Sequence, residues 1–342
     1  MIESNHFELI QKILFNPEKL NVNSLEQVNW QEFVICLRQH SLLSLVYNEL
    51  ISLKKFAIPE SLNSAAQASA ILKHLLQQAT LQIVRQLNQC DISVLILKGF
   101  LLSELLYQDA LLRDSGDIDL LVPANRLQDA LQVLSDLGYR PVLSILPGAI
   151  SYDQKINHAY EYEHLETGLK VDLHWALVER YYAEPAYTEA AWSSAVDREL
   201  AGAKFKTLSL EQNYLLICLQ SFKDRWASLG HLLDVYNFER NFKTITSDVK
   251  LLSQKLDLEL VVAAASQQAN LVFECGQQPI NQISSEFTVL LSSRDKFANK
   301  VRSLIFRYLL PFGPDLCVKS RFQYWLTFIF KPLRVIFRAI VQ

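Results

Sequence analysis

The sequence RDSGDIDLLV, residues 113–122, constrains the fold more than any other stretch of this 342-residue chain. Its apolar half predicts a β-strand over 117–122, and the side chains of a strand alternate between its two faces. Asp117 and Asp119 therefore share one face, and the apolar residues between and after them form the other. Two carboxylates this close raise each other's pKa unless a cation lies between them, and Mg²⁺ is bound by one or two carboxylates together with substrate phosphates. The alternative interpretation is a strand end with two solvated acids.

Composition restricts the class of protein. Hydrophobic residues make up 50% and charged residues 20%, which argues against disorder, and the net charge of -3 provides no overall attraction to nucleic acid or membrane. The five cysteines are widely spaced without a C-x-x-C pair, which argues against a disulfide framework or a zinc site and predicts buried free thiols. The N-terminus lacks a signal-peptide pattern, and no window reaches about 18 uninterrupted apolar residues, so we expect a cytoplasmic protein without a transmembrane helix.

Glycine placement divides the chain, because glycine marks tight turns and close backbone approaches. Residues 1–90 precede the first glycine and are rich in helix formers, so we expect a helical N-terminal region. Within it, a helix capped by Ser61 is predicted to run to about Cys90. Its apolar face is expected to contain Leu72, Leu75, Leu76, Ala79, Ile83 and Leu87.

Residues 91–178 change to short apolar runs separated by turns, which predicts the α/β part of the fold. A strand over Ile92–Leu97 ends at Lys98-Gly99 and is followed by a helix over Phe100–Tyr107. Further on we expect a helix that Pro123 opens and Gly138 ends, a strand over Tyr139–Ile145, and a hairpin of Ala159–Leu165 with Leu169–Trp175 around Gly168.

A third carboxylate lies on the second strand of that hairpin, in the sequence KVDLHW. Lys170, Asp172 and His174 share one face of this strand. Asp172 therefore strengthens the metal interpretation, although it is also suited to cap a turn or to pair with Lys170. His174 is either a partner of the Asp172 carboxylate, a contact for a nucleotide, or an ordinary hydrogen-bonded histidine.

Residues 179–310 are predicted to form a helical C-terminal domain. Ser209-Leu210-Glu211-Gln212 has the form of a capping box, and the helix that it opens is expected to bury Leu215, Leu216, Leu219 and Phe222. Residues 311–342 form a basic aromatic tail, with five cations and no acid after Asp315. This tail is suited either to weak contact with an anionic membrane surface or with nucleic acid, or to docking on the core with its cations in water.

These segments together resemble the uncharacterised nucleotidyltransferase family of the polymerase-β-like superfamily. The resemblance rests on Leu97-Lys98-Gly99, Leu106-Tyr107, Arg113 with GDIDLLV, VDLHW at 171–175, and a helix with Lys223 and Arg225-Trp226. It covers roughly residues 90–240, and the order of glycine turn, paired aspartates and third aspartate is its specific part.

The resemblance implies an α+β fold with a nucleotidyltransferase-like mixed β-sheet core between helical N-terminal and C-terminal regions. It also implies an Mg²⁺-dependent transfer of a nucleoside monophosphate from an NTP to an acceptor hydroxyl, with release of pyrophosphate. Asp117 and Asp119 would hold the metal, and Asp172 would complete a second metal site or help to deprotonate the hydroxyl. Lys98, the Gly99 backbone and Arg113 are the expected phosphate contacts, and Lys223 and Arg225 are further nucleotide-binding candidates that also fit exposed helix cations.

The chain shows two departures from the pattern of this family. Phe100 follows Gly99 where active members of the superfamily usually carry serine, and Phe222 and Asp224 stand where the family often has histidine. The first departure supports an alternative from a different functional class, a non-catalytic nucleotide sensor or partner-binding module that keeps the fold.

Overall fold

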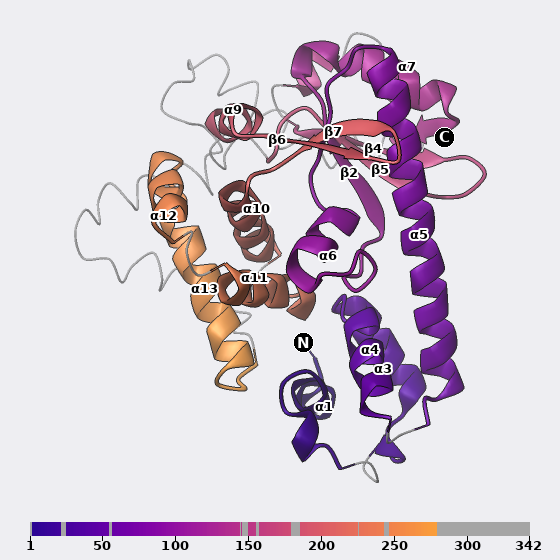
Figure 1. Ribbon diagram of the computed structural model, residues 1–342, viewed down its shortest axis with the longest axis vertical. Coiled ribbons are helices and arrows are strands. Elements are labelled where there is room, and N and C mark those ends of the chain that lie inside the picture. Colours follow the sequence, from indigo (N-terminus) through magenta and orange to yellow (C-terminus); the bar gives the residue numbers. More distant parts are fainter. Residues whose placement is uncertain are drawn as a thin grey trace.

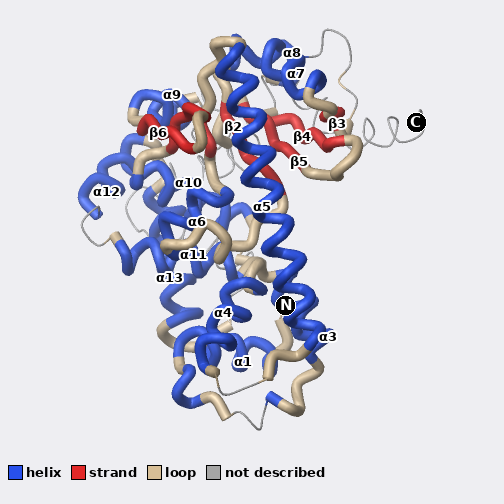
Figure 2. Tube along the Cα trace, turned by 45° about the vertical axis from the view of Figure 1, so that its right-hand side comes forward, coloured by secondary structure: helices blue, strands red, loops and turns tan. Residues whose placement is uncertain are grey.

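The computed structural model describes residues 2–21, 25–54, 57–143, 145, 150–154, 157–178, 185–224, 226–242 and 246–278. Figures 1 and 2 show a β-sheet at one end of the molecule and helices from the two ends of this described chain at the other. No helix within these ranges is both long enough and apolar enough to cross a membrane. The basic aromatic tail, 311–342, lies outside the described residues.

The sheet contains seven strands in the order β3-β4-β5-β2-β1-β7-β6 and is mixed, as the sequence predicted. At its centre β2 is parallel to β5 and antiparallel to β1, while β4 and β5 form the expected antiparallel hairpin. The strands are β1 (Leu95–Ile96), β2 (Asp117–Leu121), β3 (Tyr139–Pro141), β4 (Ala159–His164), β5 (Lys170–His174), β6 (Val196–Leu200) and β7 (Ala203–Thr207). Strands β1 and β3 are thus shorter than the apolar runs that predicted them.

One face of the sheet is apolar because alternate residues of the central strands point to it. Ile118 and Leu120 of β2 and Val171 and Leu173 of β5 are all buried there. They share a hydrophobic core with α5 (Glu60–Gln89) and α7 (Leu127–Asp136). The opposite face of the same strands carries the aspartates, so the alternation that the sequence predicted holds in both strands.

A second core joins helices from the two ends of the described chain. The N-terminal set is α1 (Ser4–Phe15), 3₁₀ turn η1 (Pro17–Lys19), α3 (Trp30–Gln39) and α4 (Leu43–Leu53); the C-terminal set is α10 (Leu210–Lys223), α11 (Leu229–Asn241), α12 (Thr246–Lys255) and α13 (Glu259–Phe273). The ring of Phe15 contacts those of Tyr236 and Phe273. Gly230 donates to the His40 carbonyl at 2.8 Å, and a Cβ at Gly230 would lie 2.7 Å from that oxygen. The two helical regions therefore pack as one body.

Helix α5 spans both cores, and its course corrects two details of the prediction. Ser61 is not the cap, because the helix begins at Glu60 after the extended Pro59. Leu72 and Leu75 are exposed by 38% and 47%, although their spacing fits the buried face. The first turns pack in the helical body and the last turns pack under the sheet, along one stripe that continues through Lys73, Leu76 and Thr80. Leu72 and Leu75 lie beside this stripe.

The region expected to be helical after residue 178 contains a β-hairpin, which is the main correction to the sequence analysis. Strands β6 and β7 are joined by Ala201 and Gly202, both with positive φ, and β7 extends the sheet in parallel with β1. Ala203 and Phe205 bury on the apolar face. Helix α9 (Ala186–Ser193) precedes the hairpin, and α10 follows it with Ser209 accepting from the Gln212 amide, as the capping box predicted.

The remaining elements are short connections around the sheet: α6 (Gly99–Tyr107), η2 (Ala124–Arg126) and α8 (Ile150–Asp153). Cys36 and Cys218 are buried free thiols as expected, whereas Cys90 and Cys275 are exposed. Leu215, Leu216, Leu219 and Phe222 of α10 are buried as predicted.

A buried ion pair joins the segment before β2 to the helical body. Arg113 Nε lies 2.8 Å from Asp234 Oδ2 of α11, and their side chains are only 9% and 3% exposed. Tyr107 at the end of α6 donates its hydroxyl to Asp234 Oδ1 at 2.9 Å. Asp234 therefore neutralises a buried guanidinium and also accepts a hydrogen bond from the half-buried Tyr107 phenol.

We expect Asp234→Ala to lower the free energy of unfolding by about 3–5 kcal/mol, because it leaves Arg113 charged, buried and unpaired. Asp129→Ala is the matched control: Arg126 Nε lies at the same 2.8 Å from Asp129 Oδ2, but these side chains are 34% and 59% exposed. Its loss is expected to cost no more than about 1 kcal/mol. Urea denaturation of both variants measures the difference, and equal losses would contradict the assigned role of the buried pair.

Candidate active site

The polar face of the sheet brings together the three aspartates named from the sequence. Parallel pairing of β2 and β5 sets Asp119 opposite Asp172, and Asp117 lies one pleat before Asp119 on the same face. One carboxylate oxygen of Asp119, one of Asp172 and one ring nitrogen of His174 lie within 4.8 Å of one another. The structure therefore adds His174 to the acidic group, where the sequence left its role open.

The Asp119 side chain is only 9% exposed and has a nitrogen partner on each carboxylate oxygen. His174 Nε2 lies 3.1 Å from Oδ1, and Lys98 Nζ lies 3.5 Å from Oδ2. Burial alone would raise the pKa of Asp119, but the Lys98 ammonium and the His174 hydrogen bond hold it well below its ordinary value. Asp119 is therefore ionised at neutral pH.

Asp117 and Asp172 show the opposite shift. Burial, and then the neighbouring Asp119 charge, raise the pKa of Asp117. Burial also raises the pKa of Asp172 to about 6, with repulsion from Asp119, Asp117 and Glu161 opposed by His174. At neutral pH this face thus carries more negative charge than its own cations compensate, so an added cation would stabilise it.

The donor atoms fit a divalent metal. Carboxylate oxygens are the hard ligands that Mg²⁺ takes, and the three acids come from two adjacent strands whose opposite face is locked in a core. His174 Nδ1 is buried and has no hydrogen-bond partner among the described residues. A histidine that holds a carboxylate through one nitrogen is suited to orient that carboxylate as a metal ligand.

The turn after β1 lies beside the acids. Lys98 precedes Gly99, which adopts φ +60° and opens α6, and a Cβ at Gly99 would meet no atom of a non-neighbouring residue within 4 Å. Phe100, the next residue, is buried in the core under the sheet. Helix α5 closes this corner from the other side: Lys73, Gln77 and Thr80 line a hollow of about 10 Å³ together with Lys98, Gly99, Asp117 and Asp119.

Arg113, an expected phosphate contact, has a buried protein partner in the structure. Its guanidinium is buried in the ion pair with Asp234 described above, so it is not placed as a free phosphate ligand. Its charge still acts on the site, because Arg113 contributes to lowering the pKa of Asp117 and of Asp119. Phosphate contact by Arg113 therefore stays a prediction, and the ion pair with Asp234 is a partner that the sequence did not indicate.

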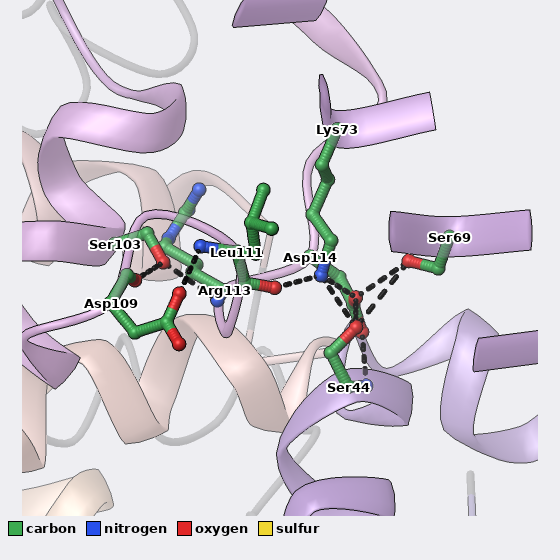
Figure 3. A network of polar contacts seen from close by, with 8 residues as sticks. All are labelled: Ser44, Ser69, Lys73, Ser103, Asp109, Leu111, Arg113 and Asp114. Carbon is green, nitrogen blue, oxygen red and sulfur yellow. Dashed lines mark hydrogen bonds and ion pairs between the residues drawn. The ribbon is translucent and has the colours of Figure 1, made fainter. Parts of the chain in front are cut away.

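Asp114, the next residue, anchors the same segment in the opposite direction. Figure 3 shows Ser44 of α4 and Ser69 and Lys73 of α5 converging on its carboxylate. Lys73 is only 4% exposed, lies 3.2 Å from Asp114 Oδ1 and also donates to the Leu111 carbonyl. Burial lowers the pKa of Lys73, while Asp114 opposes the shift. Sequence reasoning missed this network, since nothing in the spacing of α5 relates Lys73 to residue 114.

The remaining predicted nucleotide contacts lie in the helical region. Lys223 is the last residue of α10 and is part-buried, and Arg225 lies outside the described residues. The adjacent Asp224 pairs with His231 of α11, at 2.7 Å between Oδ2 and Nδ1. Nucleotide binding by Lys223 and Arg225 stays a prediction.

Comparison with solved structures finds nucleotidyltransferases. A solution structure of the antibiotic-resistance factor ANT(2'')-Ia is 14% identical, with 58% of this chain and 97% of that chain covered and a TM-score of 0.36. A crystal structure of ANT(2'')-Ia in complex with adenylyl-2''-tobramycin is 16% identical, with coverages of 56% and 98% and a TM-score of 0.36. An antigenic nucleotidyltransferase-like protein from Paracoccidioides brasiliensis is 20% identical, with coverages of 55% and 92% and a TM-score of 0.33.

No curated protein matches the sequence. A family model does: the one described as "Uncharacterised nucleotidyltransferase" matches residues 26–274. The match includes α3 and α4, the whole described sheet with its three aspartates, and the C-terminal helices through α13. It is therefore far longer than the motif region that suggested the resemblance. The chain belongs to the uncharacterised nucleotidyltransferase family.

Proposed function

We propose that this protein is an Mg²⁺-dependent nucleotidyltransferase that moves a nucleoside monophosphate from an NTP to an acceptor hydroxyl and releases pyrophosphate. The observation that carries the proposal is the parallel pairing of β2 with β5. It sets Asp119 opposite Asp172, with Asp117 on the same face and the Lys98-Gly99 turn beside them. Membership of the family supports the type of reaction.

Asp117 and Asp119 would hold the metal that binds the triphosphate, and Asp172 would complete a second metal site or help to deprotonate the acceptor, as the resemblance implied. When bound, Mg²⁺ supplies positive charge to the triphosphate and to the attacking and leaving oxygens of an in-line displacement at phosphorus. His174 orients Asp119 through the hydrogen bond to Oδ1.

Lys98 and the backbone amide of Gly99 would bind the phosphates of the nucleotide. The amide opens α6, where backbone N–H groups and the helix dipole favour anions. The Lys98 ammonium adds a flexible point charge at the same turn. Together they would bind the triphosphate next to the acids, without the serine hydroxyl that Phe100 replaces.

Asp172 is suited to receive the proton of the acceptor. Its carboxylate lies on the same polar face, opposite Asp119, and a carboxylate is a suitable general base. In the proposed step the acceptor oxygen bonds to the α-phosphorus, the bond from phosphorus to the pyrophosphate oxygen breaks, and the hydroxyl proton passes to Asp172.

One observation favours a second candidate function, a non-catalytic nucleotide sensor. Phe100 is buried in the core, so the turn after β1 offers no side-chain hydroxyl to the phosphates. A sensor would bind nucleotide through Lys98 and Gly99 without releasing pyrophosphate. Measurement of both binding and pyrophosphate release separates the two functions.

We expect wild-type protein to bind at least one of ATP, GTP, CTP and UTP only with Mg²⁺, and Asp119→Asn to lose this binding. The substitution removes a ligand charge while conserving its shape. Isothermal titration calorimetry with and without Mg²⁺ measures the effect. Asp136→Asn, an exposed acid at the end of α7, is the control and should bind like wild type. Equal Mg²⁺-dependent binding by Asp119→Asn would refute this metal site.

Asp172→Asn is expected to separate binding from chemistry. Asp117 and Asp119 remain to hold the metal–nucleotide complex, so we expect affinity to change by less than about tenfold while pyrophosphate release falls by about 100-fold or more. Release is measured with water and with a panel of hydroxyl compounds as acceptors. Wild-type binding without any release would favour the sensor, and full release by Asp172→Asn would remove its assigned role.

A further inference from the structure

Lys98 has two candidate partners at one turn, the Asp119 carboxylate and the phosphates of a nucleotide. We propose that Lys98 pairs with Asp119 while the site is empty and moves to the phosphates when a nucleotide binds. While Lys98 is paired with Asp119, its charge weakens the binding of divalent metal alone, so metal and nucleotide bind together. The inference rests on the proposed metal and nucleotide site and assigns Lys98 a positioning role within it.

The contacts of Asp119 supply the first step. Its two oxygens are shared between His174 at Oδ1 and Lys98 at Oδ2, and its side chain is 9% exposed. A metal ligand distance is about 2.1 Å, so a cation bound at Oδ2 would lie close to an ammonium that is itself 3.5 Å from that atom. Two like charges this close in a partly buried site repel strongly. Metal at Oδ2 and Lys98 in its observed position therefore oppose each other.

His174 and Lys98, the two partners of Asp119, differ in how freely their side chains can move. His174 is 6% exposed, lies within strand β5 and contacts the ring of His158, so it is held in place. Lys98 lies outside regular structure, just before α6, and its side chain is 19% exposed. Its ammonium lies at the end of a flexible aliphatic chain. Lys98 is thus the partner that can leave, and Asp119 stays oriented by His174 when it does.

A nucleotide bound at the Gly99 turn would give Lys98 a second partner. Gly99 opens α6 beside Lys98, and the space that a Cβ at this glycine would occupy is clear of non-neighbouring residues to 4 Å. A polyphosphate at this helix terminus would attract the ammonium more strongly than a carboxylate does, because it carries several charges. Its binding would release Oδ2 to the metal. By linkage, metal and nucleotide would then raise each other's affinity.

The test measures binding of Mn²⁺ alone, followed by the electron paramagnetic resonance signal of the free ion. We expect Lys98→Met to bind Mn²⁺ about tenfold tighter than wild type, since the competing charge is gone, and to bind nucleotide about tenfold weaker. Opposite changes in the two affinities are not expected from simple damage to the fold. A thermal melt checks that each variant is folded.

Three further variants control the interpretation. Lys98→Arg keeps the charge and should bind Mn²⁺ like wild type. Lys170→Met removes a lysine from the same face, where Lys170 pairs with Glu161 at 2.9 Å and not with Asp119, and should change Mn²⁺ affinity by less than about twofold. Adding Asp119→Asn to Lys98→Met should abolish the gain.

Unchanged or weaker Mn²⁺ binding by folded Lys98→Met overturns the exchange. So does a gain of the same size in Lys170→Met, since the effect would then reflect net charge alone. Failure of the proposed function is a separate result, because it appears as the absence of Mg²⁺-dependent nucleotide binding by the wild type.

Discussion

The in-register parallel pairing of β2 with β5 is the constraint on which the rest of the site depends. It places ionisable residues directly opposite one another on the polar face while the alternate residues lock both strands into a core. Burial, and then repulsion between carboxylates so close, raise the pKa of Asp117 and of Asp172. Lys98, His174 and Arg113 offset this repulsion at Asp119. The structure thus holds an arrangement of acids that an isolated strand would not maintain.

Two consecutive residues connect this face to the helices. Arg113 pairs with Asp234 of α11 from the C-terminal helices, and Asp114 pairs with Lys73 of α5 from the N-terminal ones. Both pairs are largely buried, so the start of β2 is held from two sides. Because the N- and C-terminal helices share one core, the segment before the acids rests on a single body. Such support suits a site whose chemistry depends on well-positioned ligands.

Local signals in the sequence predicted the features that depend on neighbouring residues. The alternation in GDIDLLV predicted that Asp117 and Asp119 share one face. Ser209 with Gln212 predicted the start of α10, and Gly168 predicted the β4–β5 hairpin. The β6–β7 hairpin was missed because most of its residues are polar or exposed, and of these strands only Ala203 and Phe205 enter the core. Their burial depends on the pairing of β7 with β1, a strand more than 100 residues earlier. Leu72 and Leu75 fit a helical stripe but lie where α5 passes between cores.

The sequence by itself determined the alternation of the strands and the presence of three acids on polar faces, because each depends on the spacing of neighbouring residues. It also determined the family pattern, which depends on the order of short motifs along the chain. Only the tertiary structure decided their partners. Arg113, expected to contact phosphate, is paired with Asp234, 121 residues later. His174 meets Asp119 across two strands, and Lys73 meets Asp114 from a helix that precedes the sheet. A charged side chain takes its partner from whatever packing brings near it, and packing between distant segments leaves no periodic trace in the chain.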